Sequence, residues 1–219
     1  MDSMEAMQAR HSVRAYTDRP VEAEKRRQLE ALADRCNGQS GLHIRCCWDD
    51  PAGFDSRLAH YGSFRGVHSY LVLAGPPTPA LEETCGYYGE KLVLAAQCMG
   101  LNTCWAALTF HKAAVKKRLH PGDRLVAVIA VGYGANQGVP HKSRPWEKLV
   151  AADGDLPEWF RCGAQGALLA PTALNQQKFR ISLEAGEPVI RAVGFGPYTK
   201  VDLGIVKYHF EAASGHPVR

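Results

Sequence analysis

Two short runs of almost wholly apolar residues limit what this chain can fold into. The runs "SYLVLAG" (residues 69–75) and "RLVAVIAVGYG" (residues 124–134) have the length of β-strands. A strand with one face in water alternates apolar and polar residues, and these runs do not alternate. We therefore expect the first strand to be covered on both faces and the second to be a central strand. The longest aliphatic run, residues 125–131, is far too short to cross a bilayer as a helix.

Helical segments flank these strands in the sequence. Residues 80–100 predict a long helix that stops at Gly100, and its second half is apolar nearly all round, so it should be central. Residues 21–36 predict an amphipathic helix that the segment "CNGQSG" ends. Further strands are expected at "LHIRCCW" and "LNTCWAALTF", and a basic amphipathic helix at "HKAAVKKRL".

The last third of the chain follows a different plan. The segment "ANQGVPHKSRPWE" is rich in glycine, proline and cations, which predicts a linker or an extended surface arm. Beyond it, Asp155 should cap a helix that has Pro157 in its first turn. Strands "KFRISL" and "PVIRAVG" follow, with a turn at Gly186. Thr199 and Asp202 have capping-box-like spacing before a final helix.

Two stretches share the order helix, polar loop, strand: "QLEALADRCNGQSGLHIRCCW" and "AQGALLAPTALNQQKFRISL". Their identity is slight, so an internal duplication stays open at this point. The loops differ sharply, because the second one carries amides and a hydroxyl after Pro171. A plain connection between a helix and a strand does not need such a set of side chains.

Composition narrows the class of protein. Apolar residues make up 46% and charged residues 22%, which is typical of a globular chain of one large domain or two small ones. The net charge of +4 allows an anionic ligand but does not indicate the dense basic face of a nucleic-acid binder. The start, "MDSMEAMQAR", lacks the apolar run of a secretory signal. Seven cysteines without a C-x-x-C pair and nine scattered histidines predict reduced thiols, no metal site and a cytoplasmic protein.

Two basic clusters carry candidate ligands for an anion. In "RHSVRAY", Arg10, Ser12 and Arg14 alternate, so in an extended segment their side chains point the same way. Two guanidinium groups and a hydroxyl suit a phosphate, because arginine offers forked donors. In "HKSR", Lys142 and Arg144 repeat the alternation. Each cluster alone also fits a solvated basic face or a charged linker, but the two together favour a common anion.

The segment "GLNTCWAAL" follows the expected central helix. Cys104 and Trp105 fit a hydrophobic core most simply. The functional alternative is that the N–H groups of Ala106 and Ala107 face a ligand, where small side chains let a flat ring approach closely. No Ser-His-Asp order, H-E-x-x-H or P-loop occurs, and "GFGPYTKVDLG" lacks the third glycine of a dinucleotide-binding motif.

In this order the motifs resemble those of the FMN-dependent nitroreductase family. Arg10, Ser12 and Arg14 match its R-x-S-x-R segment, and "MGLNTCWAAL" matches its G-L-x-T-C-W turn. "AVGYGA" matches its L-G-Y-P-A strand end, and "KSRPWEKLV" its basic K-x-R-x-P-L-E arm. The match covers residues 10 to about 150. The resemblance implies an α+β nitroreductase-like fold, with a central, mostly antiparallel sheet flanked by helices.

The family binds its flavin at a homodimer interface, where the partner subunit supplies an A-P-S-x-x-N-x-Q-P-W loop. This chain has "CNGQSG" where that loop normally falls, and "APTALNQQKF" near its end, in which Lys178 replaces the usual proline. The resemblance therefore implies an intrachain pseudo-dimer, as in a tandem subgroup of the family. Residues 1–150 would carry the FMN phosphate site, and residues 151–219, a truncated second half, would supply the partner loop. The loop positions are matched by Pro171, Thr172, Asn175 and Gln177.

The same resemblance implies a site and a reaction. The arm and the arginine segment hold the FMN phosphate, Asn175 and Gln177 hold the ring edge or ribityl chain, and the Ala106 N–H reaches toward N5. NADH or NADPH gives hydride to the flavin, and a nitroaromatic, quinone or similar acceptor then takes its place in a ping-pong cycle that needs no catalytic side chain. The implied cofactor-binding residues are Arg10, His11, Ser12, Arg14, Cys104, Trp105, Ala106, Ala107, Lys142, Arg144, Pro171, Thr172, Ala173, Asn175 and Gln177.

Other functions stay open on the sequence. A flavin-binding protein for storage, sensing or delivery would keep the phosphate site but respond poorly to NAD(P)H, and a bare interaction module would be colourless. Relatives that use reduced FMN for dehalogenation or flavin breakdown usually carry extra lid segments, and the sequence has no long insertion. The expected partners are a nicotinamide donor and a small-molecule acceptor, with no nucleic acid and no membrane. The chain is expected to act as a monomeric pseudo-dimer, with further homodimerisation left open.

Overall fold

The computed structural model describes residues 1–61, 63–152 and 154–219. The chain forms two compact units. The four-stranded unit comprises Arg10–Leu81 and Leu92–Val139, and the three-stranded unit comprises Met1–Ala9, Glu82–Lys91 and Pro140–Arg219. The predicted halves, 1–150 and 151–219, are defined by resemblance to the family and not by compact units. They stay a prediction.

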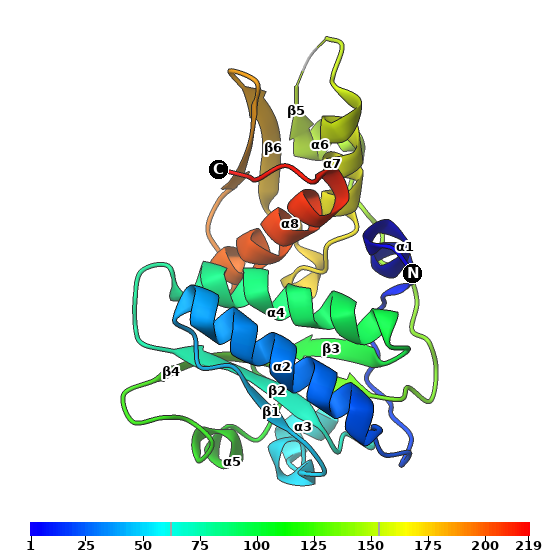
Figure 1. Ribbon diagram of the computed structural model, residues 1–219, viewed down its shortest axis with the longest axis vertical. Helices are drawn as coiled ribbons and strands as arrows, with labels where there is room; N and C mark the ends of the chain where they lie inside the picture. Colours follow the sequence, from blue (N-terminus) through cyan, green and yellow to red (C-terminus); the bar gives the residue numbers. More distant parts are fainter. Residues whose placement is uncertain (62, 153) are drawn as a thin grey trace. The chain divides into compact units, whose positions relative to one another are not determined.

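An antiparallel sheet forms the core of the four-stranded unit (Figure 1). Its strands lie in the order β1, β2, β4, β3. Every residue of β2 is buried, and so are the last six residues of β4, which confirms the expectation drawn from the two apolar runs. Within the described ranges, none of the helices is long and apolar enough to cross a membrane. The strands are β1 (Arg45–Cys47), β2 (Tyr70–Gly75), β3 (Asn102–Ala106) and β4 (Arg124–Gly132).

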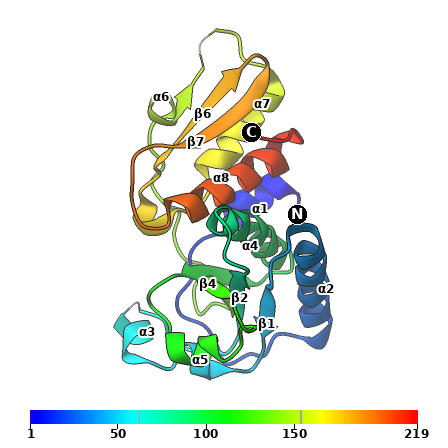
Figure 2. The same cartoon turned by 90° about the vertical axis from the view of Figure 1, so that its left-hand side faces the viewer.

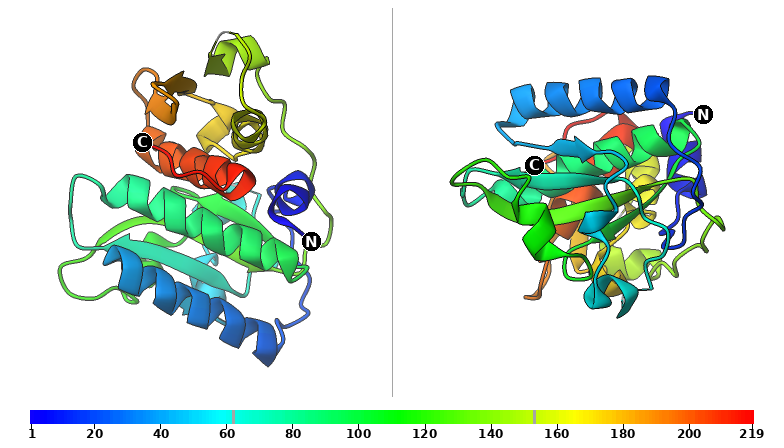
Figure 3. Two further views of the ribbon diagram at one scale, coloured as in Figure 1. Left: turned by 45° about the horizontal axis from the view of Figure 1, so that its top comes forward. Right: turned by 90° about the horizontal axis from the view of Figure 1, so that it is seen from below.

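Helix α2 (Ala23–Ser40) runs alongside this sheet (Figure 3). The expected end at Cys36 is wrong, because the helix continues through the polar segment "CNGQS". Asn37 supports the extra turn: its Nδ2 donates to the Ile44 carbonyl at 2.9 Å, and its Oδ1 accepts the Ile44 N–H at 2.7 Å. Gly41 then ends the helix with a φ of 71°, in the left-handed region that glycine adopts without strain. The shorter helices of this unit are η1 (Pro51–Gly53), α3 (Arg57–Tyr61) and α5 (Lys112–Lys116).

The three-stranded unit contains a hairpin and a short parallel strand (Figure 2). The hairpin turns at Ala185 and Gly186, which have φ values of 52° and 84°. Positive φ at both central residues is typical of a type I′ hairpin turn, so the expected turn at Gly186 is confirmed. The strands are β5 (Val150–Ala151), β6 (Phe179–Glu184) and β7 (Glu187–Ala192). The helices are α1 (Ser3–Ala9), α6 (Trp146–Leu149), α7 (Glu158–Leu168), η2 (Ala173–Asn175), α8 (Thr199–Ser214) and residues 82–91 of α4 (Leu81–Cys98).

Glycines let the helices of the three-stranded unit approach very closely. A Cβ added at Gly204 of α8 would lie 1.9 Å from the Glu83 carbonyl oxygen of α4, and one at Gly86 of α4 would lie 2.0 Å from the Val201 carbonyl oxygen. Gly163 of α7 makes the same kind of room for an aromatic ring of α8. The helices therefore pack with their backbones almost in contact, a distance that any larger residue at these positions would prevent.

A fully buried polar pair lies among these helices. His209 of α8 donates from Nδ1 to the Gly166 carbonyl at 3.0 Å, and its Nε2 lies 2.9 Å from Glu90 Oε1. Both side chains have no exposed surface. Each ring nitrogen of His209 thus has an oxygen partner, as burial of a polar side chain demands.

The starts of α7 and α8 differ from the sequence expectation. Asp155 does not cap α7, which begins after Pro157, and its carboxylate lies 3.3 Å from the Arg161 guanidinium instead. Thr199 and Asp202 form no capping box, because the Thr199 hydroxyl donates to a carbonyl before the helix. The Asp202 carboxylate accepts hydrogen bonds from Ala173 and Gln176 of a neighbouring loop, so it does not cap the N–H groups of the first turn of α8.

Candidate functional site

The segment of residues 10–14 extends the four-stranded sheet at its β3 edge. Ser12 forms a parallel bridge with Thr103, and the Val13 N–H donates to the Thr103 carbonyl at 3.0 Å. Val13 is fully buried, whereas Ser12 and Arg14 are exposed. The segment is therefore extended, with the opposite-facing side chains that a strand requires.

Three of the predicted side chains affect the pKa of Cys104 on β3. Cys104 is buried, and the predicted residues that act on its thiol are Arg14, Ser12 and Arg10. Burial raises the pKa of the Cys104 thiol, and these three neighbours oppose the rise only in part. Arg10 is 5% exposed, so its guanidinium is close to a low-dielectric interior. Two positively charged arginines therefore act on a thiol that is uncharged at neutral pH.

The other predicted residues of this unit also lie along β3 or beside it. His11 donates from Nδ1 to the Gln137 carbonyl at 3.0 Å, which ties the segment to the turn after β4. Trp105 is partly exposed, and Ala106 is buried at the end of β3. Ala107 follows directly and is partly exposed. The four-stranded unit thus brings one group of predicted residues together at the edge of its sheet.

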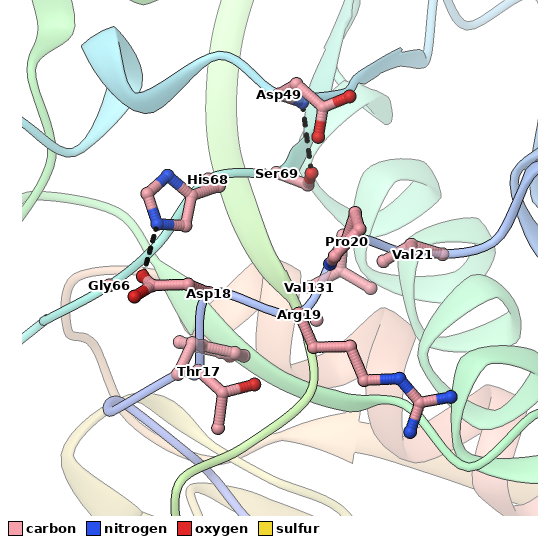
Figure 4. Close-up of a pocket in the computed structure, with 12 residues that line it drawn as sticks. Thr17, Asp18, Arg19, Pro20, Val21, Asp49, Gly66, His68, Ser69 and Val131 are labelled. Atoms are coloured by element: carbon pink, nitrogen blue, oxygen red, sulfur yellow. Dashed lines mark hydrogen bonds and ion pairs between the residues drawn. The ribbon is translucent and has the colours of Figure 1, made fainter.

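A pocket elsewhere in the four-stranded unit has a volume of about 250 Å³ (Figure 4). Its charged groups already have partners: Asp18 lies 3.1 Å from His68 Nε2, and Asp49 lies 2.6 Å from Arg26. None of the residues predicted to bind a cofactor lines it, so it is not part of the candidate site. The lining residues are Tyr16, Thr17, Asp18, Arg19, Pro20, Val21, Asp49, Gly66, His68, Ser69, Val131 and Gly132.

In the three-stranded unit, residues 141–144, here called the basic arm, are bound to residues 171–177, here called the amide loop. Gln177 Oε1 accepts the Arg144 N–H at 2.7 Å, and Gln177 Nε2 donates to the Lys142 carbonyl at 2.9 Å. Asn175 Nδ2 donates to the same carbonyl at 3.0 Å. The side chains of Lys142 and Arg144 are exposed. The structure therefore brings together a second group of predicted residues.

The backbone of the amide loop is strained. Leu174, Asn175 and Gln177 have φ values of 52°, 52° and 45°, in the left-handed region that residues other than glycine rarely adopt. That region costs roughly 1–2 kcal/mol for an ordinary residue. Thr172 helps to hold it, because its hydroxyl oxygen accepts the Gln177 N–H at 3.1 Å. Such strain persists where surrounding contacts enforce it, and it is concentrated at functional sites. The remaining predicted residues of the loop, Pro171, Thr172 and Ala173, are partly buried.

Sequence reasoning missed Asp202 as a support of the amide loop. Its carboxylate accepts the Ala173 N–H at 2.9 Å and a hydrogen bond from Gln176 Nε2 at 2.7 Å. Burial raises the pKa of Asp202 to about 6, although both hydrogen bonds act in the opposite direction. Its spacing from Thr199 predicted a helix cap. No local sequence pattern connects Asp202 with the amide loop, because the strands β6 and β7 lie between them in the chain.

Comparison with known proteins decides the family. A family model described as "Putative TM nitroreductase" matches residues 2–214. The chain belongs to this nitroreductase family. A solved structure described as a "putative nitroreductase" from Thermotoga maritima MSB8 has a TM-score of 0.67 at 24% identity, over 97% of this chain and 83% of that chain. A search of curated proteins found no match.

Two further structures extend the likeness within the nitroreductase fold. A "putative nitroreductase in complex with FMN" from Desulfovibrio desulfuricans has a TM-score of 0.55 at 21% identity, over 71% of this chain and 98% of its own. A "Putative NADH dehydrogenase/NAD(P)H nitroreductase" from Parabacteroides distasonis has a TM-score of 0.53 at 26% identity, over 67% of this chain and 95% of its own. These likenesses confirm the expected α+β nitroreductase-like fold, with an antiparallel sheet and flanking helices. They leave the intrachain pseudo-dimer as a prediction.

Proposed function

We propose that this chain is an FMN-dependent NAD(P)H oxidoreductase, which takes hydride from NADH or NADPH and passes it to a nitroaromatic, quinone or similar acceptor. Membership of the nitroreductase family supports an oxidoreductase reaction. The structure from D. desulfuricans, described as a complex with FMN, supports the cofactor. The observation that carries the proposal is the cluster of Arg10, Ser12 and Arg14 on the extended segment that pairs with β3 through Ser12, Val13 and Thr103.

The chemistry of this cluster fits the phosphate of FMN. Arginine presents forked N–H donors that match phosphate oxygens, and the Ser12 hydroxyl adds a further donor. Two guanidinium groups balance the roughly two negative charges of a phosphate monoester at neutral pH. Because burial raises the pKa of Cys104, its thiol stays protonated and does not cancel the positive charge.

We assign the basic arm and the amide loop to the same cofactor. Lys142 and Arg144 provide two more exposed cations for the phosphate, and Pro171 and Thr172 provide a surface for the ring. One chain would then form a complete site as a pseudo-dimer. Two structures of the nitroreductase fold align over 95% and 98% of their own length but cover only 67% and 71% of this chain. This difference supports the proposal that the chain carries a segment beyond one nitroreductase-like half.

When bound, FMN supplies the redox chemistry, which is the transfer of hydride between the nicotinamide donor and the acceptor. The residues of the chain hold and orient the cofactor. The arginines and Ser12 retain the phosphate, and the N–H groups of Ala106 and Ala107 offer donors to the ring. No proton transfer is assigned to a side chain, so loss of activity in variants should follow loss of FMN.

The test is a titration of the protein with FMN, comparing the wild type with an Arg14→Ala variant. Each hydrogen bond to a charged group contributes about 1.5–3 kcal/mol, so Arg14→Ala should lower FMN affinity roughly ten- to a hundredfold. Arg19→Ala is the matched control, because Arg19 is an exposed arginine of the same unit paired with Glu22. Unchanged FMN affinity in Arg14→Ala, or equal losses in both variants, would contradict the phosphate cluster.

A further inference from the structure

Each polar atom of the Gln177 side chain has a partner within this chain. Its Oε1 accepts the Arg144 N–H, and its Nε2 donates to the Lys142 carbonyl and to Asn175 Oδ1, at 2.7, 2.9 and 2.8 Å. Gln177 is 3% exposed. An amide has two N–H donors and one oxygen, and here each of these polar atoms already has a partner. This leaves Gln177 little capacity to hydrogen-bond a flavin, in contrast to the role implied by the family resemblance.

The two backbone groups that Gln177 binds have a special relation. The Lys142 carbonyl belongs to the peptide before Ser143, and the Arg144 N–H belongs to the peptide after it. One planar amide that bonds both peptides restricts φ and ψ of Ser143. These two angles, together with ψ of Lys142 and φ of Arg144, set the direction of the Lys142 side chain relative to that of Arg144. The Ser143 hydroxyl adds a third restraint, because it donates to the Leu168 carbonyl at 2.9 Å.

The cations themselves are left available. Lys142 and Arg144 are exposed, and in the described part of the chain neither forms an ion pair. Asn175 strengthens the hold on their backbone, since it donates to the Lys142 carbonyl and accepts from Gln177. Asn175 and Gln177, whose side-chain amides bond the arm, both have a strained left-handed φ. The loop therefore holds the backbone of the arm and leaves its charges to an external anion.

We propose that Gln177 is a positioning residue that orders the basic arm, so that Lys142 and Arg144 present two cations to the phosphate of FMN. This inference rests on the proposed FMN function. An arm that is ordered before binding loses less conformational entropy when the phosphate binds, so the entropic cost of binding is lower. Gln177 thus increases affinity for the phosphate end of the cofactor without touching the ring.

The test compares two ligands, FMN and riboflavin, which share the ring and the ribityl chain and differ only in the phosphate. Gln177→Ala should weaken FMN binding about ten- to a hundredfold and leave riboflavin binding nearly unchanged. Gln176→Ala is the control from the same loop, because Gln176 bonds Asp202 and the Pro197 carbonyl rather than the arm. It should change the ratio of FMN to riboflavin affinity less than threefold.

A double-mutant cycle shows whether Gln177 acts through the cations. In a Lys142→Ala/Arg144→Ala background, Gln177→Ala should cause no further loss of FMN affinity. If Gln177→Ala does not fold, Asn175→Gly serves instead, because glycine keeps the left-handed backbone and removes one donor to the Lys142 carbonyl. It should lower FMN affinity severalfold, and riboflavin affinity less.

Equal losses of FMN and riboflavin affinity in Gln177→Ala would overturn the inference and give Gln177 a contact with the ring or ribityl chain. A full additional loss in the arm-deleted background would overturn it as well. Failure of the wild type to bind FMN at all would instead reject the proposed function. The two failures are therefore distinguishable in one set of titrations.

Discussion

Asp202 gives the folded protein a pH-dependent contribution to stability that Asp202→Asn should remove. Asparagine has nearly the same shape and keeps one oxygen to accept the Ala173 N–H, but it has no titratable proton. Its amide nitrogen replaces the oxygen that accepts from Gln176, which changes stability by the same amount at every pH, so the pH dependence isolates the ionisation of Asp202. Asp202 is 5% exposed, so a shift of its pKa acts on stability without strong screening by solvent.

The magnitude follows from the pKa. Burial raises the pKa of Asp202 from an ordinary 3.8 to about 6. The folded state thus binds the proton more tightly than the unfolded state, so this contribution is present in full well below the unfolded pKa of 3.8 and is lost as pH rises through about 6. At 1.36 kcal/mol for each pKa unit, the full loss is about 3 kcal/mol, of which about 2.4 kcal/mol falls between pH 4 and 7.5.

The assay is urea unfolding of the wild type and Asp202→Asn at several pH values across this range. The free energy of unfolding of the variant is subtracted from that of the wild type at each pH, which cancels the other titrating groups. The difference should fall by about 2–2.5 kcal/mol from about pH 4 to 7.5. A difference that is flat, or that rises with pH, would refute the raised pKa and the burial that causes it.

Two other substitutions test the packing of the three-stranded unit, again by urea unfolding. Gly204→Ala should destabilise by about 3 kcal/mol or more, because its Cβ would lie 1.9 Å from the Glu83 carbonyl oxygen and two backbones must separate. Gly38→Ala, in a helix with open space around it, is the control and should be neutral or stabilising by about 0.5–1 kcal/mol; equal effects would contradict the close helix crossing. Glu90→Ala should cost about 3–5 kcal/mol by removing the carboxylate partner of the buried His209 Nε2, and Glu90→Gln should cost less. A Glu90→Ala variant as stable as the wild type would contradict the buried pair.

The central sheet could be predicted from the sequence because burial on both faces leaves a pattern that depends on no distant residue. The strand β2 and residues 125–132 of β4 are uninterrupted apolar runs, and β2 and the last six residues of β4 are buried in the structure. The hairpin turn at Gly186 was also predictable, since positive φ at that position selects for glycine.

Helix ends were harder, because contacts that are remote in sequence decide them. Helix α2 passes the expected stop since Asn37 bonds both backbone groups of Ile44. Asp202 has the spacing of a capping residue, yet it binds Ala173 and Gln176. A local pattern cannot show which of two available partners a polar side chain takes.

The sequence predicted the part of the candidate site in which basic and hydroxyl residues occupy every second position of one segment. The order Arg10, Ser12, Arg14 predicted an extended basic segment, and the structure places it beside β3. The hydrogen-bond partners of Gln177 could not be predicted, because the sequence does not show whether a glutamine side chain bonds a flavin or the protein backbone. Lys178, which replaces the family's usual proline, donates to the Phe195 carbonyl at 2.8 Å, and this contact too has no local sequence signal.

The most direct measurement of the central claim is the visible absorbance of the FMN-loaded protein during anaerobic mixing with NADH or NADPH, followed by a quinone. The proposed function predicts that at least one nicotinamide bleaches the flavin absorbance within the time of turnover and that the quinone restores it. A protein that holds FMN but keeps its oxidised spectrum with both donors would contradict the oxidoreductase and leave a flavin-binding protein without turnover.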